Sequence, residues 1–232
     1  MKKKHDIRRL LSKLTAIFLI TLSSAAAADK VVVIPLDSGS GDTGRVRTVT
    51  SATGRIWIDR NLGAHRAAIK SDDPLAYGAL YQWGRLGDGH EYRESPTTSS
   101  RSPDDVPGHN YFITGLSDWR VTQKDSLWQG ASGINNPCPA GFRLPTETEW
   151  ETERASWSSN DAVGAFASAL KLVEAGYRLI SDGTVYRVGS RGYYWSSTVD
   201  GSFTRNLSVN IDHAYMGTSS RANGMSVRCI KD

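Results

Sequence analysis

The chain has 232 residues, of which 39% are hydrophobic, 9% aromatic and 22% charged. These values are typical of a globular protein and exclude a disordered, collagen-like or membrane-bundle chain. The formal net charge of +4 is also found in nucleic-acid-binding proteins, but residues 1–28 alone hold six basic residues and one acidic residue. The rest of the chain therefore carries a net charge of −1, which does not support non-specific binding to phosphate backbones.

Residues 1–28 have the three parts of a secretory signal peptide. A basic start is followed by an apolar run over 14–22, and then by small residues that offer a cleavage site after Ala27 or Ala28. The apolar run is shorter than the about 20 residues that a membrane span needs, so a membrane anchor is the weaker interpretation. We expect export to the periplasm, the cell surface or the medium, and no membrane span in the mature chain.

Cys138 and Cys229 are the two cysteines of the chain. Export takes them to an oxidising compartment, which favours a disulfide bond between them over two buried free thiols. A closed loop of roughly 90 residues stabilises a fold by about 4–5 kcal/mol in the simplest chain-entropy treatment. Two cysteines cannot form a four-cysteine zinc site, and the histidines show no metal-ligand spacing, so we expect no metal and no cofactor.

The first half of the mature chain is rich in turns. Residues 29–45 begin with a short β-type run over 31–34 and continue as a loose segment, so they are predicted to be a flexible linker. Residues 46–50 and 55–59 predict a hairpin that opens one domain over 46–232. Residues 63–130 form a long turn-rich region that is credible only if its aromatic residues hold it against a core. These residues are Tyr77, Tyr81, Trp83, Trp119 and Trp128.

The second half has clearer signals. Thr146 and Glu149 have the spacing of a capping box, which predicts a helix over 146–156. An apolar stripe predicts a second helix over 160–174, with Gly176 as its stop. Strands are expected over 177–180, 184–188, 193–199, 205–211 and 225–230. Helices placed between two groups of strands predict an α+β domain.

Motifs of the common enzyme classes are missing. The chain has no nucleophile elbow, phosphate-binding loop, dinucleotide-binding glycine motif or zinc-protease motif. Ser196-Ser197 is not accompanied by a histidine or acid that the sequence places beside it, so a hydrogen-bonding scaffold role is favoured. The run GDGHE over 87–91 offers carboxylates to a hard cation but lacks the alternating acids of a calcium loop, and a solvated turn is favoured. We therefore expect a protein that is not an enzyme.

Several motifs, in order along the chain, carry a family resemblance. They are DRNLG over 59–63, YGALYQW over 77–83, NPCPAGFRLPT over 136–146 with the following Glu149-Trp150, YWSST over 194–198 and SVRC over 226–229. Together they resemble the Fibrobacter succinogenes major paralogous domain, from about residue 47 to the end. The resemblance implies a loop-rich C-type-lectin-like fold with two helices and a small, twisted, mostly antiparallel sheet. It also implies that the first and last strands pair and that the two cysteines lock the terminal strand to the helix region.

Two neighbouring families share parts of this pattern. The element RLPTETEWE over 143–151 is similar to one in formylglycine-generating enzymes, whose catalysis depends on a copper-binding cysteine pair. Here the only cysteines occupy the positions of the structural pair, which argues against that activity. Calcium-dependent sugar-binding lectins carry tripeptide motifs that this chain lacks, which argues against calcium-mediated sugar binding.

The last third resembles the variable region of proteins that diversity-generating retroelements alter at adenines of asparagine codons. The resemblance lies in RNLSVNIDHAYM over 205–216 and RANG over 221–224. It implies a set of altered, ligand-binding positions within a fixed frame. The altered positions are Tyr193, Asp200, Ser202, Phe203, Ser208, Asn210, Asp212, His213, Tyr215, Gly217, Thr218, Ser219 and Ser220. The frame is Trp195, Leu207, Ala214, Met216, Arg221 and Val227.

The altered positions have the composition of an adaptable paratope, with aromatic rings among small hydrogen-bonding groups. Phe203 and Tyr215 are the expected energetic anchors, because aromatic residues dominate binding hot spots. The favoured hypothesis is an exported, non-catalytic protein that binds a protein or glycan through residues 193–220, without a cofactor or nucleic acid. The alternatives are a polar turn-rich region without a ligand, a structural or adhesive cell-envelope protein without diversification, and, third, an oxidase like the formylglycine-generating enzymes.

Overall fold

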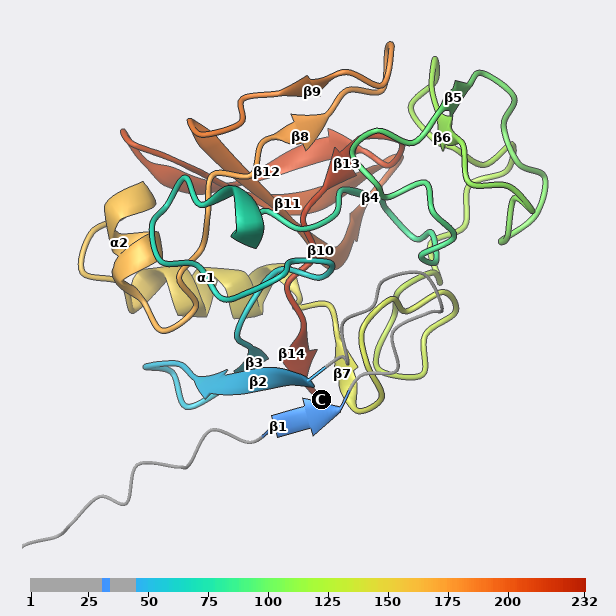
Figure 1. Ribbon diagram of the computed structural model, residues 1–232. Helices are drawn as coiled ribbons and strands as arrows, with labels where there is room; N and C mark the ends of the chain where they lie inside the picture. The colour runs from blue at the N-terminus through green and yellow to red at the C-terminus, as the bar shows by residue number, and fades with distance from the viewer. Residues whose placement is uncertain (1–30, 34–44) are drawn as a thin grey trace, which may run out of the picture.

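The computed structural model describes residues 31–33 and 45–232, a chain of short strands with two helices (Figure 1). The predicted signal peptide and residues 34–44 of the predicted linker lie outside the described residues. The described part is a mixed α+β fold dominated by strands, in several small and mostly antiparallel sheets. Neither of its two helices is long and apolar enough to cross a membrane.

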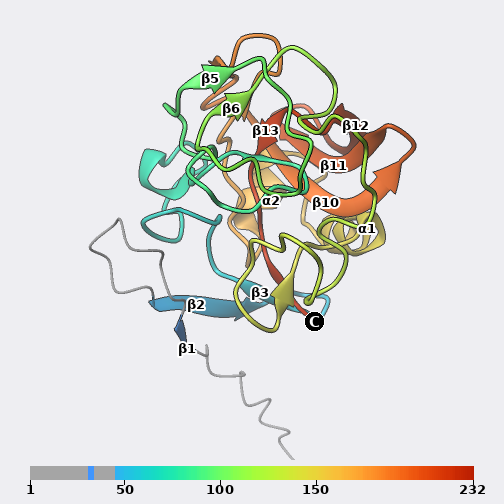
Figure 2. The ribbon, with the colours of Figure 1, turned by 90° about the vertical axis from the view of Figure 1, so that its right-hand side faces the viewer.

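One sheet joins the two ends of the domain, and Figure 2 shows it beside the C-terminus. The predicted hairpin is confirmed as β2 (Arg45–Thr50) and β3 (Ile56–Ile58), and β3 pairs with the last strand, β14 (Ile230–Lys231). β7 (Phe142–Arg143) pairs with the other side of β14, and β1 (Val31–Val33) pairs with β2. The first strands of the domain and the last one therefore lie in one sheet.

The predicted disulfide bond is confirmed between Cys138 and Cys229, whose Cα atoms are 5.8 Å apart. Cys138 precedes β7 and Cys229 directly precedes β14, so the bond reinforces the pairing of these two strands. Cys229 is buried in the larger core cluster. The bond thus ties the end of the chain to the segment that leads into the first helix.

The largest ladder in the described part is the antiparallel sheet of β10 (Arg191–Asp200), β11 (Phe203–Asn210) and β12 (Ala214–Ser220). These strands confirm the two predicted over 193–199 and 205–211. One face of the sheet packs on both helices, because its apolar residues cluster with Trp150. Figure 1 shows the helices on that side and the β8–β9 hairpin on the other.

The remaining strands are short. β4 (Tyr81–Gln82), β13 (Gly224–Met225), β8 (Tyr177–Arg178) and β9 (Val185–Tyr186) form one sheet. β5 (Thr97–Thr98) and β6 (Phe112–Ile113) form a parallel pair, and a 3₁₀ turn covers Pro74–Ala76. The hairpin predicted over 177–188 is confirmed as β8–β9. The strand predicted over 225–230 is divided between β13 and β14, which belong to different sheets.

The first predicted helix is confirmed as α1 (Glu147–Ala155). Its capping box is complete, because the Glu149 backbone N–H donates to Thr146 Oγ1 at 3.2 Å and the Thr146 N–H donates to Glu149 Oε2 at 2.9 Å. The prediction of a second helix over 160–174 is wrong beyond its first half. α2 (Ala162–Ala167) has Ser168 as its C-cap, and the chain continues without helical structure.

Distant side chains satisfy the backbone where that predicted helix fails. The Leu170 carbonyl accepts from Arg228 Nη1 at 2.7 Å, and the Tyr194 hydroxyl bonds both the N–H and the carbonyl of Val173. Leu170 and Val173 are buried, as the apolar stripe predicts, but in a non-helical segment. Tertiary hydrogen bonds therefore replace the helical ones.

The tryptophans hold the loop region over 63–130 against the core, as predicted. Trp83, Trp119 and Trp128 have no exposed surface. Trp83 Nε1 donates to the Ser196 carbonyl at 2.9 Å, and Trp119 Nε1 donates to the Trp83 carbonyl at 2.8 Å. These bonds connect the loops to each other and to β10, so the large sheet rests on a fixed support.

Candidate functional site

The two faces of the β10–β12 sheet differ in what covers them. Residues directly opposite each other on neighbouring strands share a face. Tyr193 of β10 pairs with Ser208 of β11, which pairs with Tyr215 of β12, so these three side chains lie on one face. The opposite face carries the residues that pack on the helices. We call the face with Tyr193, Ser208 and Tyr215 the open face; at its other end Trp195, which pairs with Asn206, is buried in the larger core cluster.

The central strand of the open face carries three polar side chains in alternate positions, Asn206, Ser208 and Asn210, which we call the β11 polar row. Each is at most 2% exposed. Asn206 Oδ1, Ser208 Oγ and Asn210 Nδ2 are buried and have no hydrogen-bond partner among the described residues. A buried polar atom without a partner costs about 1–3 kcal/mol of stability. The row is therefore a set of unused donors and acceptors that a partner reaches only if the side chains around them move.

Aromatic rings flank the β11 polar row on both neighbouring strands. The Tyr193 ring lies 4.8 Å from the Tyr177 ring of β8, measured between centroids. On β12, the Tyr215 ring stacks on His213 at 5.0 Å and is 38% exposed. A Cβ atom at Gly217 would lie 3.4 Å from the Tyr215 ring and 3.8 Å from Asn206 Oδ1, which is ordinary van der Waals contact, so a small side chain would fit there.

Arg191 supplies a positive charge at one end of the open face, where it pairs with Asn210. Hydrogen bonding to Tyr193 raises the pKa of Arg191, and the negative charge of Asp212 acts in the same direction. The guanidinium group therefore stays charged. The open face combines aromatic rings, amides, hydroxyls and one cation, which are groups that recognise ligands by stacking and hydrogen bonding.

The structure brings together about half of the predicted ligand-binding residues. The members on the open face are Tyr193, Ser208, Asn210, Tyr215, Gly217 and Ser219. His213 joins them through its stacking on Tyr215, and Asp212 lies in the same turn. Thr218 pairs with Arg205 on the helix-facing side, and Asp200, Ser202, Phe203 and Ser220 lie at the far end of the sheet.

The two expected anchors, Phe203 and Tyr215, do not lie together. Tyr215 is opposite Ser208, five residues from Phe203 along β11, which corresponds to about 17 Å at the usual rise per residue. The alternation of the strand also places Phe203 on the other face. Both rings are partly exposed, at 44% for Phe203 and 38% for Tyr215. The two rings are therefore too far apart to contact one small group together, and Tyr215 is the one on the open face.

Burial separates the predicted altered positions from the predicted frame. Most altered positions are exposed or half-buried, and Ser208 and Asn210 are the buried exceptions. In the frame, Trp195, Leu207, Ala214, Arg221 and Val227 are buried and Met216 is half-buried. Arg221 Nη2 donates to Asp125 at 2.7 Å and its guanidinium lies 4.8 Å from the centre of the Trp83 ring.

Sequence reasoning missed three members of this surface: Asn206, Tyr177 and Tyr186. Asn206 alternates with the apolar Leu207 and Val209 in the same way as Ser208 and Asn210, so period-two patterning could have found it. Tyr177 and Tyr186 come from the β8–β9 hairpin, whose rings lie 6.5 Å apart. No pattern along the sequence places that hairpin beside β10.

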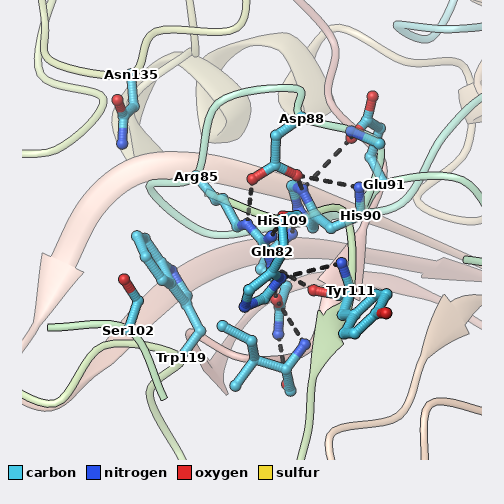
Figure 3. A network of polar contacts seen from close by, with 12 residues as sticks. Gln82, Arg85, Asp88, His90, Glu91, Ser102, His109, Tyr111, Trp119 and Asn135 are labelled. Atoms are coloured by element: carbon cyan, nitrogen blue, oxygen red, sulfur yellow. Dashed lines mark hydrogen bonds and ion pairs between the residues drawn. The ribbon is translucent and has the colours of Figure 1, made fainter. Parts of the chain in front are cut away.

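A second polar cluster lies in the loop after β4, where Asp88, His90 and Glu91 bring ligand atoms within 4.8 Å of one another (Figure 3). His90 is fully buried and Glu91 is 7% exposed, so the prediction of a solvated turn is wrong. The neighbouring Arg85 guanidinium is also buried and donates through Nε to Asp88 Oδ2 at 2.8 Å. A cation therefore already stands beside the carboxylates.

The hydrogen bonds of this cluster are complete. The Gln82 backbone N–H donates to His90 Nε2 at 3.1 Å, so the ring proton is on Nδ1, which donates to Asp88 Oδ1 at 2.7 Å. Burial lowers the pKa of His90 to about 4, so the ring is neutral at pH 7. Burial alone would raise the pKa of Asp88, but the contacts with His90 and Arg85 lower it overall. A metal would have to displace these bonds, so we interpret the cluster as a structural link.

The serine pair and the cysteines offer no activated nucleophile. Ser196 is buried, and its Oγ donates to the Arg205 carbonyl at 2.8 Å and accepts from the Thr198 N–H at 3.2 Å. Both cysteine sulfurs are used in the disulfide bond. The open face remains the best candidate site. Comparisons with protein-family models, curated proteins and solved structures found no match.

Proposed function

We propose that the chain is an exported, non-catalytic recognition module that binds a protein or glycan through the open face of the β10–β12 sheet. The observation that carries this proposal is the exposed, stacked pair of rings, His213 and Tyr215, which lies beside the β11 polar row. Asn206, Ser208 and Asn210 hold unused hydrogen-bonding atoms in fixed positions between Tyr193 and Tyr215. Preorganised polar groups beside rigid aromatic rings bind a partner with little loss of conformational entropy.

A C-type-lectin-like fold, as in the Fibrobacter succinogenes major paralogous domain, is the finer form of this proposal. It is supported by the pairing of β3 with β14 and by the disulfide bond that reinforces the terminal strand. The two short helices on one side of the large sheet and the long tryptophan-held loops also agree with it. The sequence motifs named above supply the family assignment.

Diversification by a retroelement is the finer proposal for the origin of the surface. It is supported by the contrast between the buried frame and the exposed positions over 193–220. The frame residues Trp195 and Leu207 belong to the two main core clusters, where substitutions would disturb packing. The exposed positions of the open face and of the two turns, such as Tyr215, Asp212 and Ser202, can change without that penalty.

A cell-envelope protein without diversification is the second candidate, and an oxidase like the formylglycine-generating enzymes is the third. A cell-envelope protein would use the same face for adhesion. Only natural variation in the sequence of that face separates this candidate from a diversified recognition module. The oxidase would need free thiols, whereas both sulfurs here are joined to each other. Turnover of a cysteine-containing peptide in the presence of copper would support the third candidate.

The test compares Tyr215→Ala with Tyr92→Ala, a matched control whose ring is 64% exposed and lies outside the open face. Both proteins are applied to arrays of glycans and of purified surface proteins. We expect capture by the wild type and the control, and at least a tenfold loss of affinity in Tyr215→Ala with nearly unchanged thermal unfolding. Equal capture by both variants would contradict binding at the open face, and a large loss of stability would reassign Tyr215 to the core.

A further inference from the structure

A cavity of about 230 Å³ lies away from the open face, where the C-terminal ends of both helices meet the β2–β3 turn. Trp157 follows α1, Ser168 follows α2 and Ala52 belongs to the turn, and all three line the cavity. Glu153, in the last turn of α1, is the only charged residue among those that line it. The cavity therefore has a negative charge and no positive charge in its wall.

Glu153 is buried without a strong partner. The residue is 1% exposed, and its Oε1 atom has no hydrogen bond among the described residues. Its Oε2 atom accepts from Thr53 Oγ1, at 3.4 Å, and from no other described residue. Burying a carboxylate that no cation balances is unfavourable, and such groups in proteins are normally paired. The carboxylate of Glu153 is thus an acceptor that lacks its counter-ion.

The rest of the wall also favours a cation. The C-terminal end of a helix carries partial negative charge, and both α1 and α2 end at this cavity. Ser156 Oγ donates to the Glu153 carbonyl at 2.7 Å and Ser168 Oγ donates to the Ala165 carbonyl at 2.8 Å. Because its proton is donated to the helix, Ser156 Oγ keeps lone pairs that can accept a hydrogen bond, whereas Ser168 Oγ already accepts from the Leu170 N–H at 3.2 Å and keeps one.

The one cation close in sequence does not fill the site. Arg154 belongs to the last turn of α1, but its Nη1 donates to Asn160 Oδ1 at 2.8 Å and to the Ala214 carbonyl at 3.2 Å. Arg154 is absent from the residues that line the cavity, and no described residue forms an ion pair with Glu153. Glu153 therefore has no cationic partner among the described residues.

We propose that this cavity binds a small primary ammonium group, with Glu153 as its counter-ion and Trp157 as its aromatic wall. An ammonium group has three donors, which match Glu153 and the hydroxyls of Ser156 and Ser168. An indole beside a cation adds to its binding. The volume holds roughly seven water-sized groups and is smaller than typical pockets for drug-sized ligands, so a short alkylamine fits.

The probe is n-butylammonium, with n-butanol as a neutral molecule of similar size. Binding is followed by the NMR signal of the Trp157 indole N–H, whose Nε1 atom is buried and has no acceptor in the part of the chain that the structure describes. We compare the wild type, Glu153→Gln and the matched control Glu151→Gln, which changes an exposed carboxylate of the same helix. Thermal unfolding of each protein shows whether the fold is kept.

We expect n-butylammonium to bind the wild type and Glu151→Gln at least tenfold more tightly than n-butanol does. Its affinity for Glu153→Gln should be at least tenfold lower than for the wild type. If Glu153→Gln does not fold, Ala167→Leu serves as a second variant that fills the cavity and is expected to abolish binding. Equal binding of the two probes, equal binding to Glu153→Gln or Ala167→Leu, or no saturable shift in the wild type would overturn the proposal. None of these outcomes depends on the open face.

Discussion

Two buried serines on neighbouring strands differ in whether their hydroxyl groups form hydrogen bonds, so replacing each by Ala tests whether the Ser208 hydroxyl is unpaired. Ser196 of β10 and Ser208 of β11 are both at most 1% exposed. Ser196 Oγ makes two hydrogen bonds, to the Arg205 carbonyl and from the Thr198 N–H, whereas Ser208 Oγ makes none among the described residues. Replacing each by Ala removes the same atom from a similarly buried place.

The expected changes in the free energy of unfolding differ: Ser196→Ala should lower it, whereas Ser208→Ala should not. Ser196→Ala removes bonds worth about 0.5–1.5 kcal/mol each, and it leaves the Arg205 carbonyl without that donor, so the free energy of unfolding should fall by about 1–2 kcal/mol. Ser208→Ala removes a buried hydroxyl that costs about 1–3 kcal/mol and leaves a methyl-sized gap that costs about 1 kcal/mol. The free energy of unfolding should therefore stay the same or rise by up to about 2 kcal/mol.

Urea unfolding of the oxidised protein at pH 7 measures both values, and equal slopes with denaturant show that the two states are unchanged. If Ser208→Ala is destabilising by as much as Ser196→Ala, the Ser208 hydroxyl is satisfied in the folded protein. The β11 polar row would then be an ordinary part of the core, and its side chains would no longer support a binding role for the open face.

Two further predictions concern stability. Because burial lowers the pKa of His90 to about 4, this histidine binds a proton in the unfolded chain at a higher pH than in the folded protein. The free energy of unfolding should therefore fall by about 3 kcal/mol as the pH falls from 6.5 to 4. Urea midpoints that do not change over this range would contradict the buried neutral ring. Reducing the Cys138–Cys229 bond, which spans 91 positions, should lower the free energy of unfolding by about 4–5 kcal/mol. An unchanged midpoint in a thiol reductant would contradict that figure.

Elements that depend on neighbouring residues in the sequence were predicted well. Thr146 and Glu149 define the start of α1 through their own side chains and backbone, so their spacing is sufficient. The β2–β3 and β8–β9 hairpins and the strands β10 and β11 follow from local turns and alternation. The tryptophans are in the core as predicted because their size leaves them little alternative in a loop-rich fold.

Elements that depend on distant partners were not predicted. The apolar stripe from Val163 to Val173 indicates a helix, but Arg228 and Tyr194 bond the backbone after Ala167 and allow another path. Likewise, the polar run over 87–91 looks solvated until Arg85 and Gln82 are placed beside His90. These partners approach only when the whole chain folds.

The candidate site was predicted in composition and only partly in geometry. Tyr193, Ser208 and Tyr215 meet across three strands because alternation and pairing place them on one face. Phe203 was grouped with Tyr215 by residue type, although the register separates them. Glu153 gave no signal, because its burial depends on the β2–β3 turn and the end of α2.

The most direct test of a fixed frame that carries a changeable recognition surface is the natural variation of the coding segment for residues 193–220. It is measured by sequencing this segment in many copies of the gene from one population. We predict substitutions at the exposed positions and on the open face, concentrated at codon adenines, with none at the buried Trp195, Leu207 and Ala214. A segment as invariant as the rest of the gene, or substitutions spread evenly over buried and exposed positions, would contradict the account.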